Sequence, residues 1–356
     1  MKKKAMIEVQ MNWVYIIIVG SIILIFFVVI GTRYAKNAEV KINAQILQQL
    51  DATVIGASQS EKSANQIDIQ DTSLTISCSC NGNNCASQIE VTNSGLAKDI
   101  SFFPIFSVKT IENSPLITWS QEWNAPFKVT NLLYITRDDV HFYITSDGTD
   151  GDEQFAEILY QKMKENKFIK VDKIKLTELN SIAANNLYLL RVIEIKSQPA
   201  QTISNDSKMS DNKGAKNIDL LIINPENEKS GNFQLYTIKK NNKMVNKNEP
   251  ANIYLDQPTL LAMIFSEDTQ FYLCNLNKAL KHYDVISKIY LKKTDQLATE
   301  PALTYCQSYY NSAQNLLKQD FFSNGNTMSL QSTITQLNQI NEQLLVAPGG
   351  SCPQIY

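Results

Sequence analysis

Residues 13–32 read WVYIIIVGSIILIFFVVIGT, a run without a charged residue or a proline. At a rise of 1.5 Å per residue, about 20 apolar residues span the ~30 Å hydrocarbon core of a bilayer. A core helix of a water-soluble protein carries a polar stripe, which this run lacks. Trp13 and Tyr15 lie at one end of it, where aromatic rings favour the headgroup level. The run therefore predicts a transmembrane helix, with the lipid bilayer as a partner.

The sequences on either side of the run predict its orientation. Residues 1–12 form a short tail with three lysines, which is hard to translocate, whereas a long following chain crosses largely regardless of charge. The six cysteines suit an oxidising compartment. A cleaved secretory signal would have a shorter apolar region that ends at a small-residue cleavage site. We therefore expect a single-pass protein of the cell membrane, with residues 1–12 cytoplasmic and the bulk of the chain extracytoplasmic.

The start of the chain allows a second interpretation. Residues 2–8 read KKKAMIE and resemble the cleavage site of archaeal class III (prepilin) signals, with the cut between Ala5 and Met6. The segment 33–56 continues the helix as a juxtamembrane part, because apolar residues recur there at helical spacing. Pilins share this plan, but an ordinary anchor with a basic tail explains the same residues. The spaced residues are Ala35, Ala38, Ile42, Ile46 and Leu50.

Residues 72–128 form a β-rich segment with a cysteine hairpin, CSCNGNNC at 78–85. A turn at Asn81-Gly82 would place Cys78 opposite Cys85 and leave Cys80 for Cys274. A longer loop over residues 81–84 would pair Cys80 with Cys85 instead. Zinc is a further alternative, but it needs a fourth ligand and usually a C-x2-C spacing.

Residues 129–256 alternate between strand and helix patterns. Apolar strands at 140–144, 168–174, 187–195 and 218–223 with helices at 152–167 and 177–185 predict a small Rossmann-like, mainly parallel sheet. The polar segment 198–216 predicts a disordered, exposed loop, in which Asn205 begins a glycosylation sequon. Just before this region, Trp119 and Trp123 share one face of a predicted helix, and we expect them in the core.

Residues 257–356 predict an antiparallel helical subdomain, with helices at 267–297, 299–317 and 329–344. Short connections place the start of the second helix beside the end of the third. This arrangement predicts a disulfide between Cys306 and Cys352. Cys274 lies near the start of the first helix, too far from the end of that helix to reach Cys306 easily. The chain as a whole is thus predicted to be α/β.

Signals for chemistry are few. The sequence has two histidines, His141 and His282, and no motif of a zinc protease, serine hydrolase or nucleotide-binding loop. Asp147, Asp150 and Asp152 follow a strand of the sheet, where their oxygens could hold Ca²⁺, although an acidic helix start explains them equally. These carboxylates would repel phosphate, so we expect no nucleotide and no cofactor. The net charge of −2, with scattered lysines, argues against nucleic acid as a partner.

Several segments together resemble a known group of proteins. They are the N-terminal lead at 2–13, Thr118-Trp119 with Trp123, residues 129–136, and residues 264–268 with 272–275. In these segments the chain is similar to uncharacterised, single-pass archaeal membrane proteins with a class III (prepilin-like) N-terminus. The resemblance implies an anchored extracytoplasmic protein and supplies no catalytic residues.

The sequence therefore predicts a non-enzymatic protein at the outer face of the cell, which binds an unknown protein partner or organises the envelope. A pilin-like subunit of a type IV filament is the alternative, and an uncharacterised enzyme is a third.

Overall fold

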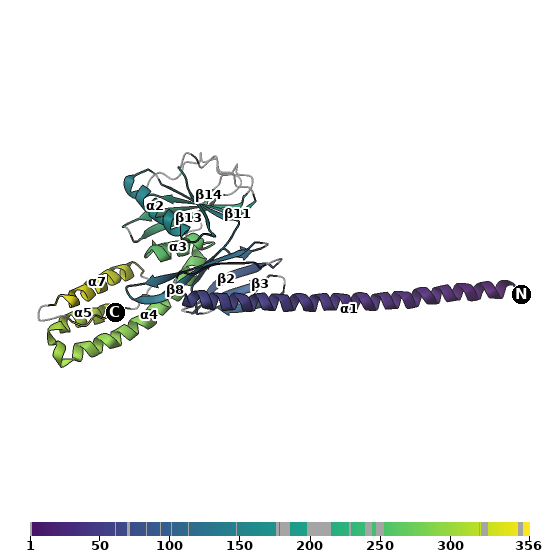
Figure 1. The fold of residues 1–356 in the computed structure, drawn as a ribbon, viewed down its shortest axis with the longest axis horizontal. Helices are drawn as coiled ribbons and strands as arrows, with labels where there is room; N and C mark the ends of the chain where they lie inside the picture. Colours follow the sequence, from purple (N-terminus) through teal and green to yellow (C-terminus); the bar gives the residue numbers. More distant parts are fainter. Residues whose placement is uncertain are drawn as a thin grey trace.

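The computed structural model has a globular head of several sheets and helices and one long N-terminal helix that projects from it (Figure 1). The predicted α/β class is confirmed, because parallel and antiparallel strands occur together with helices. The structure describes residues 2–60, 62–69, 72–82, 84–92, 94–100, 102–112, 114–146, 148–175, 178, 186–197, 215–227, 229–238, 244–246, 253–319, 321, 327–347 and 352–356.

Helix α1 (Lys2–Gln59) is one uninterrupted helix of 58 residues. Almost all of its large apolar side chains from Trp13 to Ile30 are exposed, and this part is long and apolar enough to cross a membrane. Further along, Asn43, Leu50 and Ala57 are buried. Their seven-residue spacing equals about two helical turns, so they lie on one face.

The C-terminal part of α1 docks on the head. It contacts strands β3, β4, β7 and β8, and Lys98 Nζ on β4 lies 3.2 Å from Asp51 Oδ2 on the helix. The docked face begins later than the sequence pattern predicted, since Ile42 remains exposed. The helix therefore has an exposed apolar part and a docked amphipathic part.

Two four-stranded sheets lie next to α1 (Figure 1). Their pairs are antiparallel except for β5 with β8. One sheet has the order β1 (Ala64–Ile67), β7 (Leu116–Asn124), β8 (Lys128–Arg137), β5 (Ile105–Ser107). The other has the order β4 (Leu96–Ile100), β3 (Asn84–Val91), β2 (Leu74–Asn81), β6 (Thr110–Ile111).

Trp119 and Trp123 are buried as expected, but they lie on strand β7 rather than on a helix. Positions i and i+4 share a face in both kinds of element, so the spacing alone did not distinguish them. The indole Nε1 of Trp123 donates a hydrogen bond to Asp256 Oδ2 at 2.8 Å. A buried indole needs such a partner.

The third sheet contains most of the predicted α/β region, residues 129–256. The first strand of that region, β8, instead pairs with β7 in the first sheet, so the predicted start of the region is wrong. Strands β10 (Lys170–Lys173), β9 (Val140–Ser146), β11 (Leu187–Ile195) and β12 (Ala215–Pro225) are parallel neighbours in that order. Strands β13 (Gly231–Ile238), β14 (Met244–Asn246) and β15 (Ile253–Tyr254) then add antiparallel pairs. Helix α2 (Asp150–Lys164) contacts β9, β10 and β11.

Strand β11 is buried on both faces. Leu190 and Val192 belong to one core cluster, whereas Leu189 and Ile193 belong to the other. This explains the nearly continuous apolar run in the sequence, which is typical of strands in parallel sheets.

The predicted helix at 177–185, apart from Glu178, lies outside the described residues, as do residues 198–214 with the sequon at Asn205. The last two residues of the predicted loop, Ala215 and Lys216, instead begin strand β12.

The C-terminal helices are α3 (Gln257–Phe265), α4 (Thr269–Thr299), the 3-10 helix η3 (Pro301–Cys306), α5 (Gln307–Leu317) and α7 (Thr327–Leu345). Helix α3 was not predicted, because it is buried nearly all round and shows no amphipathic pattern. Asp256 accepts a hydrogen bond from the Thr259 amide and caps its start. Helix α4 contacts α5, which contacts α7, and their buried residues join the core cluster of the antiparallel sheets.

Candidate functional site: two adjacent disulfides beside a pocket

The β2–β3 hairpin differs from the first predicted register. Cys80 pairs with Cys85, and Asn81 pairs with Asn84. The turn thus lies one residue later than the Asn81-Gly82 signal indicates, and Gly82 takes a positive φ of +57°. Glycine accepts this conformation without the steric cost of a Cβ atom. The alternative pairing of the sequence, Cys80 with Cys85, is the one observed.

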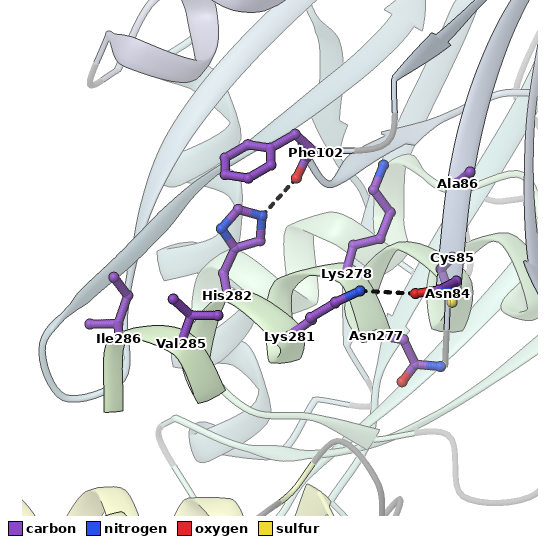
Figure 2. A pocket seen from close by; sticks show the side chains of 10 residues that line it. All are labelled: Asn84, Cys85, Ala86, Phe102, Asn277, Lys278, Lys281, His282, Val285 and Ile286. Atoms are coloured by element: carbon purple, nitrogen blue, oxygen red, sulfur yellow. Dashed lines mark hydrogen bonds between the residues drawn. The ribbon is translucent and has the colours of Figure 1, made fainter. Parts of the chain in front are cut away.

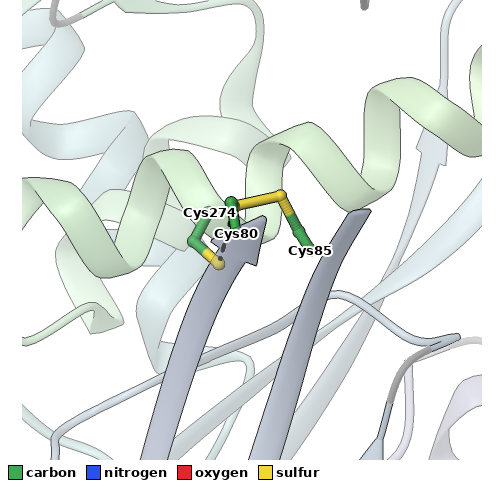
Figure 3. A group of neighbouring side chains, drawn as sticks. All are labelled: Cys80, Cys85 and Cys274. Atoms are coloured by element: carbon green, nitrogen blue, oxygen red, sulfur yellow. Dashed lines mark hydrogen bonds between the residues drawn. A yellow bond between two sulfur atoms is a disulfide. The ribbon is translucent and has the colours of Figure 1, made fainter. Parts of the chain in front are cut away.

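Two disulfides form at this hairpin. Cys80–Cys85 closes its tip, and Cys78–Cys274 joins strand β2 to helix α4 with a Cα–Cα distance of 6.1 Å. The Sγ atoms of Cys80 and Cys274 lie next to each other (Figure 3), at a distance of 3.3 Å, although each belongs to a different disulfide. Cys80 is exposed, Cys85 is half-buried and Cys274 is buried. The first prediction, Cys78–Cys85 with Cys80–Cys274, is therefore wrong because of the shifted register.

The zinc alternative depends on the oxidation state of these residues. The sulfur atoms of Cys80, Cys85 and Cys274 lie within 4.8 Å of one another. Zinc binds thiolates, and a disulfide sulfur carries no thiolate charge. In the disulfide-bonded state the cluster therefore offers thiol–disulfide chemistry rather than a cysteine metal site.

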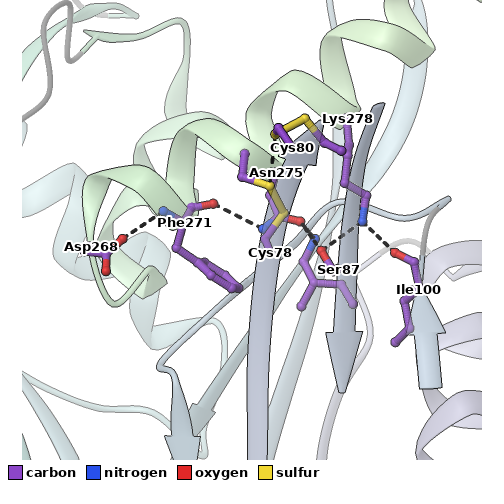
Figure 4. The surroundings of a disulfide bond; sticks show 11 residues. Cys78, Cys80, Ser87, Ile100, Asp268, Phe271, Asn275 and Lys278 are labelled. Atoms are coloured by element: carbon purple, nitrogen blue, oxygen red, sulfur yellow. Dashed lines mark hydrogen bonds between the residues drawn. A yellow bond between two sulfur atoms is a disulfide. The ribbon is translucent and has the colours of Figure 1, made fainter. Parts of the chain in front are cut away.

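A polar network fixes the hairpin against α4 (Figure 4). The Lys278 ammonium donates hydrogen bonds to Ser87 Oγ at 3.0 Å and to the Ile100 carbonyl at 2.7 Å. The Ser87 hydroxyl donates in turn to Asn275 Oδ1 at 2.8 Å, which also accepts from the Ile105 amide at 3.1 Å. Burial lowers the pKa of Lys278 to about 7. This network positions strands β3, β4 and β5 on one face of the helix.

A pocket of about 600 Å³ opens beside the hairpin tip (Figure 2). Cys85 lines it from the hairpin, and Lys281 donates a hydrogen bond to Asn84 Oδ1 at 3.1 Å. His282 Nε2 lies 2.7 Å from the Phe102 carbonyl oxygen, and burial lowers the pKa of this imidazole. Val285 and Ile286 extend the apolar wall along α4. The described lining therefore combines an apolar wall, amino groups and one disulfide sulfur.

The two histidines have separate structural roles. His141 Nε2 lies 2.8 Å from Asp172 Oδ2, and its ring stacks on Tyr143 with centroids 4.3 Å apart. The rings of His282 and Phe102 pack edge to face, with their centroids 4.5 Å apart.

The acidic residues after β9 do not act as one group. Asp147 lies outside the described residues, and Asp150 is exposed at the start of α2. Asp152 is buried and accepts hydrogen bonds from the Ser197 amide, at 3.0 Å, and the Ser197 hydroxyl. The Asp152 carboxylate thus ties the start of α2 to the end of β11, a structural use that the calcium hypothesis did not include.

A second pocket of about 550 Å³ lies beside these residues. Asp152 at the start of α2 and Ser197 just after β11 line it, and Phe155 and Leu260 add apolar surface. The hydroxyl of Tyr254, which is buried, also borders it and has no hydrogen-bond partner among the described residues. Burial raises the pKa of this phenol, so it remains a donor at neutral pH.

The sequence did not identify Lys278, Ser87, Asn275 or Tyr254 as site residues. One signal was present: Cys274 and Lys278 are four residues apart and so share a face of the predicted helix. No motif marked Ser87 or Tyr254, whose partners are remote in sequence.

The disulfide Cys306–Cys352 joins the start of α5 to the C-terminal tail, with a Cα–Cα distance of 6.1 Å. Both residues are buried. This is the pairing that the antiparallel helix arrangement predicted.

Comparison of the sequence with models of protein families gives no match, and comparisons with curated proteins and with solved structures give none either.

Proposed function

We propose that the chain is a membrane-anchored, extracytoplasmic protein that acts by binding rather than by catalysis. One observation supports the anchor: α1 exposes its apolar side chains over residues 13–30 and buries its side chains against the head only from Asn43 onward. A bilayer would remove residues 13–30 from water, and the transfer free energy would favour this by roughly 25 cal/mol per Å² of apolar surface buried. The docked part would hold the head close to the membrane surface.

The orientation follows from charge and redox chemistry. The lysines at 2–4 favour a cytoplasmic tail, and the three disulfides favour an oxidising exterior for the head.

Within the head, the sheet of strands β9 to β15 is the proposed Rossmann-like layer, and the pocket at Tyr254 is its proposed binding site. Ligands of such sheets bind outside the carboxyl ends of parallel strands. The acidic side chains near the pocket oppose anions, whereas the apolar wall and the Tyr254 donor favour a small uncharged molecule with a hydrogen-bond acceptor. Cyclohexanone is a suitable probe for the full chain in detergent. It should raise the thermal midpoint, and Tyr254→Phe should remove this increase; an equal increase in the variant would contradict the site.

The anchor is tested by alkaline extraction of membranes from cells that produce the full chain. The protein should remain in the membrane pellet. Ile22→Arg with Phe26→Arg should release it, because each arginine at the centre of a membrane helix costs about 2.5–3.5 kcal/mol on insertion scales. Ile42→Arg is the matched control, since Ile42 is exposed but lies beyond the apolar run. Release of the unchanged protein would contradict the proposal.

A pilin-like subunit of a type IV filament is the second candidate. The continuity of α1 favours it, because the apolar part and the docked part belong to one helix of 58 residues. Mass spectrometry of the mature N-terminus distinguishes the two. Loss of residues 1–5, so that the chain begins at Met6, would support prepilin processing, and an intact N-terminus would support the ordinary anchor.

A further inference from the structure

The two hairpin disulfides are close enough to exchange partners. The Sγ atom of Cys80 lies 3.3 Å from that of Cys274, which is bonded to Cys78. Thiol–disulfide exchange requires a thiolate to reach a disulfide sulfur, and the rate depends on this access. A thiolate on Cys80 would therefore stand next to its target without movement of the backbone.

We propose that Cys80–Cys85 is a thiol-exchange site for cysteine-containing peptides outside the membrane, and that Cys274 passes the exchange on to Cys78. This exchange takes up one peptide per hairpin without turnover, so it adds covalent binding to the anchoring role, and it does not depend on the pocket at Tyr254.

The exchange proceeds in two balanced steps. A peptide thiolate attacks Cys85 Sγ, a mixed disulfide forms, and the Cys80–Cys85 bond breaks with its electron pair on Cys80. The Cys80 thiolate then attacks Cys274 Sγ, the Cys80–Cys274 bond forms, and Cys78 leaves as a thiolate. The products are a peptide bound to Cys85, one new internal disulfide and one thiolate. The number of disulfide bonds in the protein, counting the mixed one, stays at its starting value.

The direction of the relay follows from exposure. Cys80 is exposed and Cys85 half-buried at the hairpin tip, whereas Cys274 is buried beneath them. An external thiol therefore meets the outer disulfide first. The amino group of Lys281, which is held at the neighbouring Asn84, adds positive charge near Cys85. Positive charge at this position favours the thiolate form of the incoming peptide cysteine, which is the nucleophile of the first step.

The pocket beside Cys85 selects the peptide. Phe102, Val285 and Ile286 form its apolar wall (Figure 2). If the peptide carries an apolar residue next to its attacking cysteine, that residue would lie against this wall while the cysteine sulfur faces Cys85. The substrate class is thus a peptide with an exposed cysteine beside an apolar side chain.

The first experiment locates the free thiol. The full chain in detergent is treated briefly with a Cys-Leu peptide, quenched with an alkylating reagent, and mapped without reduction. The relay predicts alkylated Cys78 together with a Cys80–Cys274 bond. Alkylation of Cys80 alone, with Cys78–Cys274 unchanged, would overturn it.

A variant repeats the test without peptide. Cys85→Ser leaves Cys80 without its partner, so the remaining thiol should distribute between Cys80 and Cys78. The matched control is Cys306→Ser, which frees Cys352 and should place the thiol there only. A thiol confined to Cys80 in Cys85→Ser would overturn the relay. Circular dichroism and thermal midpoints confirm that both variants are folded.

The second experiment tests the peptide preference. A Cys-Leu peptide should form the mixed disulfide about tenfold faster than a Cys-Ser peptide, as burial of part of one leucine side chain allows. Val285→Asp should remove this preference, and the exposure of Val285 makes the substitution compatible with folding. Equal rates for both peptides on the unchanged chain would overturn the assigned substrate class.

Discussion

Individual buried polar side chains hold together elements that are remote in the sequence. Lys278 is 3% exposed, yet its amino group satisfies Ser87 and a strand carbonyl at the same time. Arg191 is fully buried and donates to Asp219 and to the carbonyls of Ile264 and Ser266, which ties strands β11 and β12 to the end of α3. Such contacts join residues remote in sequence, so no local pattern predicts the partners of Lys278 or Arg191.

Lys278 should make stability depend on pH. Burial lowers its pKa to about 7, whereas the value in the unfolded chain is 10.5. Between these values the unfolded chain binds more protons, so the free energy of unfolding should rise with pH, by as much as about 2–3 kcal/mol from about pH 7 to about pH 9. Urea unfolding of Lys278→Met should lack this rise. The exposed Lys281 provides the control, since Lys281→Met should keep the rise. The same slope in wild type and Lys278→Met would refute the assignment.

Substitution of Arg191 should lower the free energy of unfolding more than most other substitutions in the head. Arg191→Met leaves the buried Asp219 carboxylate without its cation, and breaking a buried pair costs about 3–5 kcal/mol. Lys170→Met on the exposed edge strand β10 should change stability by less than about 0.5 kcal/mol. Denaturant unfolding of both variants measures the difference, and similar small losses would contradict the role of Arg191.

At the scale of elements, strands and helices with a regular apolar pattern were predictable from the sequence. The exact position of the hairpin turn was not. The apolar run of β11 and the long amphipathic helix α4 were recognised from residue spacing alone. The hairpin register differs by one residue from the one that the Asn81-Gly82 signal predicts, since Cys80 pairs with Cys85 and Asn81 with Asn84. Helix α3 was not predicted, since a helix that is buried nearly all round has no polar face to show the helical period in the sequence.

The disulfide Cys306–Cys352 should stabilise the C-terminal helices. It closes a segment of 46 residues, which corresponds to about 4 kcal/mol in the chain-entropy model. In Cys352→Ser, α7 should lose much of its protection from hydrogen exchange, while strands β9, β11 and β12 of the third sheet keep theirs. Unchanged protection of α7 would show that its packing on α5 suffices.

At the scale of the whole molecule, the chain is a disulfide-bonded head on one long helix (Figure 1). The helix was predictable because its composition determines its environment. The candidate site was predictable only in its cysteines. Its lysine, its pocket and the contact between two disulfides depend on how α4 crosses the hairpin, and that crossing depends on tertiary packing.

The most direct measurement of the anchor proposal is cysteine labelling on intact cells. Lys216→Cys places a reporter on an exposed residue of the head, and Lys4→Cys places one in the N-terminal tail. A membrane-impermeant maleimide should label the first variant before lysis and the second only after lysis. Labelling of the tail from outside, or of the head only after lysis, would contradict the proposed orientation and with it the oxidising environment of the disulfides.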